Sequence, residues 1–296
     1  LPPNYICIIY YNIKMKNKKV SIVMPTYNRA YILWKAILSI QNQTYSNWEL
    51  IVVDDRSVDD TEKLMREFSS DKRITYVKNE FTHSPAGARK YGYQLTKGDY
   101  VAYLDSDNTS YSTWLERSLE KFSSDKNIKF LYPALNFRLL HLVNGEFKAY
   151  KEEGSIYPYP TIKDLWDHKF EGDPNGLIHI AKAKQLISGW DESLTLYEDF
   201  DYSLQLAKLY PNGFYYLPLV LINYTRLYGE IGICNDATYK SIVTNLRRLD
   251  VKYQNYHEWT KRNWHSDLIK KYQTYDRQNI KPIDRIVSKY EKNISR

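Results

Sequence analysis

The first hundred residues alternate between short apolar runs and stretches with apolar residues at helical spacing. The runs at 20–24 (VSIVM) and 48–53 (WELIVV) are rich in β-branched residues, which is typical of buried strands. Between them lie apolar residues that share one helical face: Ile32, Leu33, Ala36, Ile37 and Ile40. The same rhythm predicts further strands at 74–77 and 99–104, and helices near 60–68 and 85–96. Strands that alternate with helices predict a parallel sheet with helices on both faces.

The pattern between residues 109 and 235 is less regular. Asn144-Gly145 stands between two extended runs and predicts a β-hairpin. Helical spacing predicts helices at 161–169 and 181–187, and a third that begins near Glu198-Asp199 and ends before Pro211. Two acids at a helix N-terminus suit the helix dipole, so capping alone could explain them.

Local signals also predict a helix cap and a turn. Ser57 followed by Asp60 predicts the N-cap of the helix near 60–68. The sequence DPNG at 173–176, before an apolar run, predicts a turn that lines the acceptor side of a site in the second half.

Polar residues follow the strands where each one ends. Pro25-Thr26-Tyr27-Asn28 follows the first strand, Asp54-Asp55 the second, and Asp105-Ser106-Asp107 the fourth. Ligands of parallel sheets collect outside the carboxyl ends of the strands, so these groups should line one crevice. Two carboxylates as close in sequence as Asp105 and Asp107 repel each other. The sequence therefore predicts either a polar turn open to water or a cation site there.

Composition and charge separate the tail from the rest of the chain. The protein has 296 residues, of which 43% are hydrophobic and 26% charged, which excludes disorder throughout. From Lys240 to the end there are 14 Lys/Arg and 6 Asp/Glu, a net charge of +8 for this segment. The net charge of the whole chain is +7, so the residues before Lys240 carry −1. Cys7 and Cys234 give no disulfide framework, which indicates a reducing compartment.

We expect three regions along the chain. Residues 1–17 form a non-core leader whose apolar run is too short to span a bilayer, and Met15 could be the native start. Residues 18–235 form one domain, with a nucleotide-binding half at 18–108 and an acceptor-binding half at 109–235. Residues 236–296 form a basic helical extension. We expect no transmembrane segment and a cytoplasmic protein, soluble or peripheral.

The basic tail allows two interpretations. Its charge and aromatic residues could contact anionic lipid, nucleic acid or an acidic glycan, or mediate a homo-oligomer. Without a motif we favour a solvated helix face with its aromatic residues packed inward. We expect no nucleic-acid partner.

Four blocks of the sequence resemble a known family. They are VSIVMPTYNRAYIL, WELIVVDDRSVDDT, SPAGARKYGYQLTKGDYVAYLDSDN and GWDESLTLYEDFDYSLQL. Their order and spacing resemble the inverting glycosyltransferase family 2 over roughly residues 18–210. The resemblance implies the GT-A fold, an α/β fold with a Rossmann-like, mostly parallel central sheet flanked by helices, here with a helical C-terminal extension. It also implies transfer of a sugar from a nucleotide-sugar donor, expected to be UDP-linked, to a hydroxyl of a glycan or other acceptor by single displacement.

The resemblance implies roles on the nucleotide side. Pro25 and Tyr27 would frame the base, with the ring of Tyr27 stacked on uracil. Asp55 would accept a hydrogen bond from the base, with Asp54 as its neighbour, and Arg89 would lie near the base and the acids. The nucleotide-binding set is completed by Asn28, Asp105 and Ser106.

The resemblance also implies where the metal and the catalytic base lie. Asp107 would hold Mn²⁺ or Mg²⁺, which neutralises the charge of a leaving diphosphate, and Asp105 would contact ribose or support the metal. Asp199 would be the base that takes the proton of the acceptor hydroxyl, with Glu198 as its partner. Arg226 would cover the diphosphate. The sequence departs from the family at Tyr228, where a His is often found, which leaves the third metal ligand open.

Each role has a purely structural alternative. Asp54-Asp55 could form only a turn, and Tyr27 could simply cover the end of the sheet. Arg89 could be a surface partner of Glu80 or Asp99. The remaining alternatives concern Asp199 as a helix cap only, and His168 and His179 as ordinary histidines.

Two other functions compete with the transferase. A sugar nucleotidyltransferase would need a Gly-rich phosphate loop after the first strand, and PTYNRAY is not one. A catalytically silent nucleotide- or sugar-binding protein would bind nucleotide without turnover. The QxxRW signature and membrane helices of processive synthases are absent from the sequence, which favours a non-processive hexosyl- or N-acetylhexosaminyltransferase.

Overall fold

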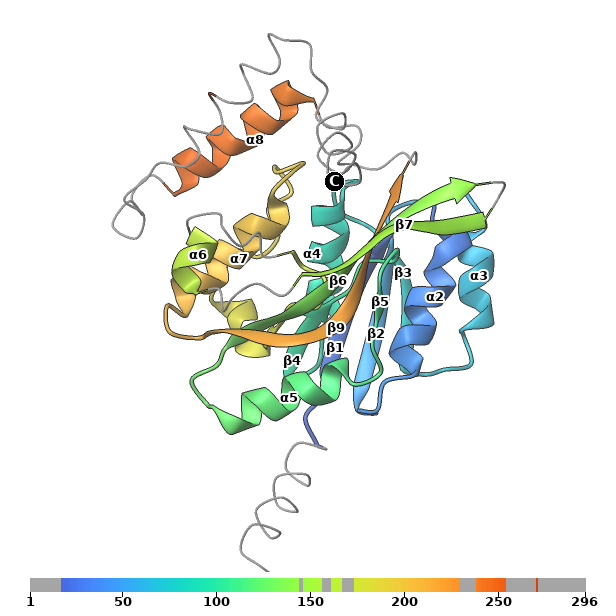
Figure 1. Cartoon of the computed structure of the whole chain (residues 1–296), viewed down its shortest axis with the longest axis horizontal. Coiled ribbons are helices and arrows are strands. Elements are labelled where there is room, and N and C mark those ends of the chain that lie inside the picture. The colour runs from blue at the N-terminus through green and yellow to red at the C-terminus, as the bar shows by residue number, and fades with distance from the viewer. Residues whose placement is uncertain are drawn as a thin grey trace, which may run out of the picture.

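The alternating half of the chain forms a parallel sheet in the computed structural model (Figure 1). The structure describes residues 17–143, 146–155, 161–166, 173–228, 238–253 and 270. The strands are β1 (Val20–Thr26), β2 (Trp48–Asp54), β3 (Ile74–Lys78) and β4 (Tyr100–Tyr103). They lie side by side in the order β3-β2-β1-β4, each at its predicted position.

Three helices connect these strands as predicted. They are α2 (Ala30–Gln41), α3 (Thr61–Glu67) and α4 (Pro85–Leu95). The five apolar residues predicted to share one face of α2 are the five that are buried. The predicted cap of α3 is wrong: α3 begins at Thr61, whose N–H donates to Asp59 Oδ1 at 3.1 Å, and Ser57 Oγ instead accepts the N–H of Asn28 at 2.8 Å.

The second half adds short helices and longer strands. They are β5 (Thr109–Ser110), α5 (Trp114–Ser124), β6 (Phe130–Val143), β7 (Glu146–Ser155), α6 (Ile162–Trp166), β8 (Ile178–Ile180), η1 (Ala181–Gln185), α7 (Glu198–Leu209), β9 (Phe214–Tyr228) and α8 (Tyr239–Lys252). The predicted hairpin is confirmed, since Val143 pairs with Glu146. The helix predicted at 181–187 is wrong in type: a 3₁₀ helix covers Ala181–Gln185, and the N–H of Leu186 closes it with an i→i−3 bond to the carbonyl of Ala183, as is usual in short connectors.

The sheet continues from β4 with mixed pairing. β8 pairs antiparallel with both β4 and β6, whereas β6 and β9 are parallel. The α/β fold is confirmed, and the parallel order is continuous only through the first four strands.

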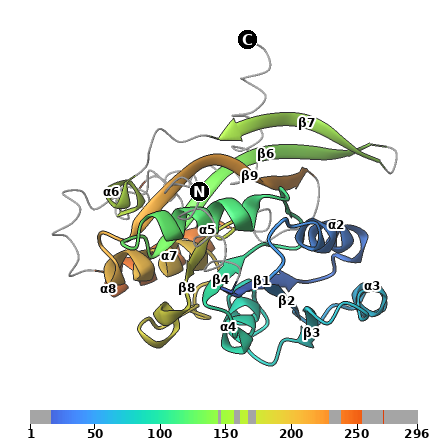
Figure 2. The same ribbon diagram turned by 90° about the horizontal axis from the view of Figure 1, so that it is seen from below.

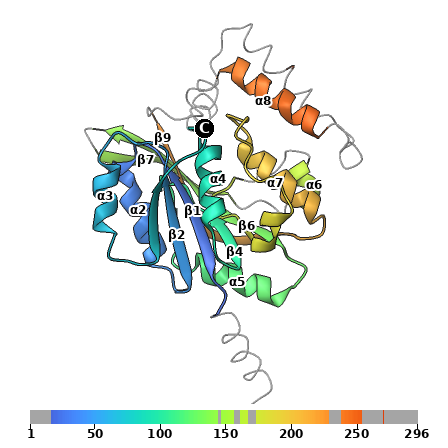
Figure 3. The ribbon, with the colours of Figure 1, turned by 180° about the vertical axis from the view of Figure 1, so that it is seen from behind.

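Helices cover both faces of the sheet. Figure 2 shows β6, β7 and β9 arching over α5 and α2, while α4 lies on the opposite face of β1, β2 and β4. Alternate residues of β1 divide accordingly: Ile22 and Met24 pack with α2 and α5, and Val23 packs with α4, α7 and α8. Figure 3 shows α4 against β1 and β4 from behind. The parallel strands are therefore held between two hydrophobic cores, one on each face of the sheet.

The extension begins with a helix that packs on this body. Leu246 and Leu249 of α8 and Tyr253 just beyond it are buried in the core with α7. Inward packing of the tail aromatics is thus confirmed for Tyr253. Residues 1–16, 254–269 and 271–296, which hold the predicted leader and most of the tail, lie outside the described residues. Within the ranges that the structure covers, none of the helices has the length and apolar character needed to cross a bilayer.

Candidate active site

Arg89 lies at the centre of a cluster of acidic side chains. Its guanidinium group donates to Asp105 Oδ1 at 2.8 Å and to Glu198 Oε1 at 3.0 Å, and its side chain is 6% exposed. Burial disfavours the charge, but the two carboxylates raise the pKa of Arg89 above its ordinary value. The alternative of a surface partner for Glu80 or Asp99 is wrong. One guanidinium therefore joins the end of β4 to the first turn of α7.

Asn175 connects Asp105 to a third carboxylate. Its side-chain oxygen accepts the backbone N–H of Asp105 at 2.7 Å, and its amide nitrogen donates to Asp105 Oδ2 at 3.0 Å and to Asp173 Oδ1 at 2.8 Å. Burial, and then the charge of Asp105, raise the pKa of Asp173 to about 7. The sequence predicted a turn at 173–176 but gave neither side chain a role in the site.

Asp107 lies beside a basic residue that the sequence did not single out. Arg29 Nη2 is 3.7 Å from Asp107 Oδ2, and the Asp107 side chain is 28% exposed. Desolvation, and then repulsion by Asp105, raise the pKa of Asp107 to about 6 in spite of Arg29. Asp107 is therefore a partly exposed carboxylate whose charged form would be favoured by an additional cation.

The turn that carries Asp105 and Asp107 is held by hydrogen bonds of Asn108. Ser106 is 5% and Asn108 2% exposed. The backbone N–H of Asn108 donates to the carbonyl oxygen of Asp105 at 3.1 Å, and its side-chain oxygen accepts the N–H of Thr225 at 2.6 Å. These bonds fix the acidic turn to β9.

The first turn of α7 carries the other two acids. Desolvation first, and then the charges of Glu198 and Asp173, raise the pKa of Asp199 well above its ordinary value. Asp199 Oδ1 accepts the N–H of Phe200 at 2.7 Å. The N-cap is Tyr197, in the left-handed region with φ 64°, so the alternative of Asp199 as a cap is wrong. A carboxylate with a raised pKa is a better proton acceptor near neutral pH.

A second cluster lies at the ends of β1 and β2. The ring of Tyr27, 47% exposed, packs edge-on against His83 with 4.9 Å between centroids. His83 Nδ1 is 3.0 Å from Asp55 Oδ2, and Asn79 Nδ2 donates to Asp55 Oδ1 at 2.6 Å. Tyr27 thus keeps an accessible ring beside an oriented carboxylate, and sequence reasoning missed His83 and Asn79.

Asp54 and Asn28 hold the two loops together. Asp54 accepts from Tyr76 OH at 2.5 Å and from the N–H of Ser57 at 2.8 Å. Asn28 has φ 50°, and its side-chain oxygen accepts the N–H of Val58 at 2.8 Å. Both contacts support the shape of the loops. Pro25, the remaining residue predicted here, lies in β1 opposite Val53 of β2.

Three other residues singled out in the sequence are Arg226, His179 and His168. Arg226 lies in β9 in register with Leu139, and its role at the diphosphate stays a prediction. His179 is an ordinary core histidine: burial lowers its pKa to about 4, and its Nε2 is 2.8 Å from Tyr202 OH. His168 lies outside the described residues.

The donor set suits a cation that is shared with a ligand. Among the residues that the structure describes, no group of three His, Cys, Asp or Glu side chains is arranged to hold a metal ion. At nucleotide sites, Mg²⁺ is usually held by one or two carboxylates together with the phosphates. Asp107, with Asp105 nearby, supplies one or two carboxylate ligands of this kind, and the phosphates of a bound nucleotide would supply the others.

Comparison with protein families decides the assignment of the first half. Residues 21–139 match the model described as glycosyl transferase family 2. Residues 21–139 belong to glycosyl transferase family 2. This family 2 segment contains Tyr27, Asp55, Arg89 and the acidic turn at 105–107, and the predicted family is therefore confirmed.

Curated relatives of the family 2 segment are named glycosyltransferases. One, from Escherichia coli, is the UDP-Glc:alpha-D-GlcNAc-diphosphoundecaprenol beta-1,3-glucosyltransferase WfgD, 40% identical over 135 residues, which cover 46% of this chain and 53% of the relative. Another, from Campylobacter jejuni, is the GalNAc(5)-diNAcBac-PP-undecaprenol beta-1,3-glucosyltransferase, 38% identical over 105 residues, 35% of this chain and 34% of the relative. The chain thus spans about half and about a third of the lengths of these two relatives.

A solved structure shares the fold. The crystal structure of S. aureus TarS 1-349 in complex with UDP-GlcNAc superposes with a TM-score of 0.64 at 19% identity, covering 80% of this chain and 67% of that one. The predicted GT-A fold is confirmed. Because the superposition covers more of the chain than the family 2 segment does, the second half shares the architecture too.

Proposed function

We propose that this protein is a metal-dependent inverting glycosyltransferase that moves a hexose from a UDP-sugar to a hydroxyl of a lipid-linked saccharide. The observation that carries the proposal is the Arg89 bridge from Asp105 to Glu198. It brings the acid turn of the family 2 segment to the helix that bears Asp199. The bridge thus supports a site that combines a nucleotide-side acid with Asp199, a half-buried carboxylate whose pKa is raised by desolvation and by its acidic neighbours.

The donor and acceptor classes come from the relatives. Both curated glucosyltransferases carry names that place glucose on saccharides linked through a diphosphate to undecaprenol, and one names UDP-glucose as donor. We therefore propose UDP-glucose as the first donor to test, and a polyprenyl-diphosphate saccharide as the acceptor class.

Asp199 acts as the general base in the proposed reaction. It takes the proton of the acceptor hydroxyl as that oxygen forms a bond to the anomeric carbon and the bond to the diphosphate breaks. The nucleoside diphosphate leaves with the electron pair of the broken bond. A single displacement inverts the anomeric centre, as in enzymes that use one base and one attacking hydroxyl. The raised pKa of Asp199 matches this role near neutral pH.

Other residues bind and orient the donor. Tyr27 stacks on the base, and Asp55, oriented by His83, accepts a hydrogen bond from it. Asp107 and Asp105 would hold Mn²⁺ or Mg²⁺, which when bound neutralises charge on the leaving diphosphate. Arg89 orients Asp105 through its hydrogen bond to Oδ1.

The test is a transfer assay with defined partners. Purified protein is incubated with Mn²⁺, a GlcNAc-diphosphate carrying a polyprenyl or short lipid chain, and UDP-glucose, UDP-galactose or UDP-GlcNAc in turn. We expect UDP release that depends on acceptor, and a β-linked product from the α-linked donor by NMR. Asp107→Ala should abolish release, whereas Asp60→Asn, an exposed acid, should not.

Three results would contradict parts of the proposal. Tight UDP binding without turnover for any donor and acceptor would favour the silent binding protein. Turnover that is unaffected by chelation of divalent cations would remove the metal. A product with retained configuration would exclude single displacement.

A further inference from the structure

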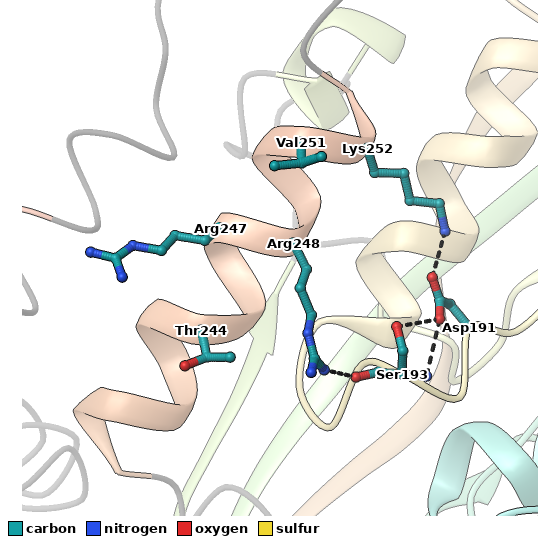
Figure 4. Close-up of a pocket in the computed structure, with 7 residues that line it drawn as sticks. All are labelled: Asp191, Ser193, Thr244, Arg247, Arg248, Val251 and Lys252. Carbon is teal, nitrogen blue, oxygen red and sulfur yellow. Dashed lines mark hydrogen bonds and ion pairs between the residues drawn. The ribbon is translucent and has the colours of Figure 1, made fainter.

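Helix α8 ends on the catalytic helix. Lys252 Nζ donates to Asp201 Oδ2 at 2.9 Å and to Asp191 Oδ2 at 2.9 Å, and Tyr253 OH donates to Asp201 Oδ1 at 2.7 Å. Figure 4 shows Lys252 reaching across from α8 to Asp191. Asp201 lies two positions after Asp199 on α7, so the end of α8 is bonded to the first turn of that helix.

The Asp201 carboxylate depends on these partners. It is fully buried, and Lys252 is 30% exposed at its side chain. An unpaired carboxylate in such a place is strongly disfavoured, so the two donors from α8 and its end define where Asp201 can lie. Burial opposes the charge of Lys252, yet Asp201 raises the pKa of Lys252 above its ordinary value.

Asp201 also connects to the loop that supports Arg89. Gln205 Nε2 donates to Asp201 Oδ2 at 2.8 Å and to the carbonyl of Gly189 at 2.9 Å. The next residue, Trp190, lies under the Arg89 guanidinium with 5.0 Å between Arg89 Cζ and the ring centroid. Contacts therefore run from α8 to the first turn of α7, which carries Glu198, and to Trp190, which lies against Arg89.

The middle of α8 holds the rest of this loop. Asn245 Oδ1 accepts the N–H of Thr195 at 3.0 Å, and its amide donates to Thr195 Oγ1 at 3.0 Å. Arg248 donates to the carbonyl of Ser193, as Figure 4 shows. The segment that leads into α7 is therefore attached along the length of α8.

We propose that Lys252 and Tyr253 are positioning residues of the catalytic centre. They fix Asp201, and through it the first turns of α7 and the loop at 189–191, so that Asp199 and Arg89 keep their places. The proposal rests on the proposed function and extends it to a helix outside the family 2 segment. The roles proposed above for Asp199, Asp107 and Tyr27 stay the same.

Substitutions at the end of α8 test this role in the full chain. The variants are Lys252→Met, which keeps the length of the stem, and Tyr253→Phe, which removes one hydroxyl while the Lys252–Asp201 ion pair stays in place. Arg247→Met is the matched control, because Arg247 is an exposed cation of the same helix and points away from the loop in Figure 4. For each we measure kcat, the KM for donor, the Kd for UDP and the Tm.

The expected result is a loss in kcat with nucleotide binding retained. Misplacement of a catalytic group by about 1 Å can cost about a hundredfold, so we expect kcat to fall about tenfold to a hundredfold in Lys252→Met and less in Tyr253→Phe. UDP affinity should stay within about twofold, since the base-binding cluster lies on other loops. Lys252→Arg should restore part of kcat. Folded variants with wild-type kcat would overturn the proposal, and so would UDP affinity that falls in step with kcat.

Hydrogen exchange separates this proposal from the proposed function. If the wild type transfers no sugar, the function fails while the positioning role is still measured by amide exchange. The proposal then requires faster exchange over 197–203 and 189–192 in Lys252→Met than in Arg247→Met. Equal exchange in the two variants would overturn it.

Discussion

The side chain of Asn175 holds Asp105 on both its backbone and its carboxylate. Its oxygen accepts the Asp105 N–H at 2.7 Å, and its nitrogen donates to Oδ2 at 3.0 Å. Only a group with a donor and an acceptor can make both bonds. Asn175, which comes from the second half of the chain, therefore orients Asp105, the first acid of the acidic turn at 105–107.

Replacing Asn175 with Asp should damage the site through a lost donor and an added charge, with little change in side-chain shape. The variant keeps the acceptor but loses the donor, and it adds a carboxylate between Asp105 and Asp173. We expect kcat/KM to fall about tenfold to a hundredfold, the range that follows loss of one charge-assisted bond. Asn127→Asp, which places the same charge on the exposed surface, is the control. Unchanged kinetics in Asn175→Asp would show that Asp105 needs no such support.

Cation binding should depend on pH through Asp107. Its pKa is raised to about 6, and the protonated form cannot bind a metal. Mn²⁺ affinity, measured by calorimetry with UDP present, should therefore weaken as pH falls through 6. Asp107→Asn should bind weakly at all pH values. Affinity that is constant between pH 5 and 7.5 would contradict the assignment of Asp107.

The same pKa shift predicts how stability responds to pH without cation. Because the folded pKa of Asp107 is above its ordinary value, the folded state binds the proton more tightly than the unfolded state. This contribution to stability is present below the ordinary pKa and is lost as pH rises through about 6. Added Mn²⁺ and UDP should raise Tm more at pH 7.5 than at pH 5. An equal rise at both pH values would speak against this linkage.

Asp199→Asn should separate catalysis from stability. Removing the base should lower kcat about a hundredfold or more. Since desolvation, and then repulsion by Glu198 and Asp173, disfavour the Asp199 charge, the neutral variant should also have a higher Tm at pH 7.5. In the wild type, kcat/KM should rise with pH through a midpoint above the ordinary range of Asp. Asp60→Asn is the matched control, and a lower Tm in Asp199→Asn would contradict the repulsion.

Tyr27→Ala should weaken nucleotide binding without unfolding the protein. Stacking of a base on an aromatic ring contributes about 1–3 kcal/mol, so the Kd for UDP should rise about tenfold or more. The Tm should change little because the ring is 47% exposed. Tyr111→Ala removes a ring that is 43% exposed and serves as control. Equal Kd values in the two variants would exclude stacking on Tyr27.

The sequence predicted the elements whose signal is local. The apolar face of α2 and the four parallel strands follow directly from periodicity, because burial on a sheet or helix repeats with the element's own geometry. The element at 181–187 was predicted as an α-helix and is a 3₁₀ helix, because its residues, AKAKQ, favour a helix of either kind. The mixed pairing of β8 and β6 depends on contacts between distant segments, which no local pattern encodes.

The site was predictable where it follows strand ends. Asp55, Asp105 and Asp107 each follow a strand, and of these three acids Arg89 bonds Asp105. The same rule applied to β3 would have found Asn79, which directly follows that strand and holds Asp55. Asp173 lies in a loop whose approach to Asp105 is set by β8, so only the folded sheet reveals it.

The long strand β6 has a consequence for anyone who wants a smaller protein. The family 2 segment ends at residue 139, inside β6, whose neighbour β9 arrives only at residues 214–228. Cutting at the family boundary would divide a strand and leave its exposed edge without β9, which invites pairing between fragments. Useful truncations should therefore keep the chain at least through Tyr253, and shuffling with relatives should exchange β6 and β9 together.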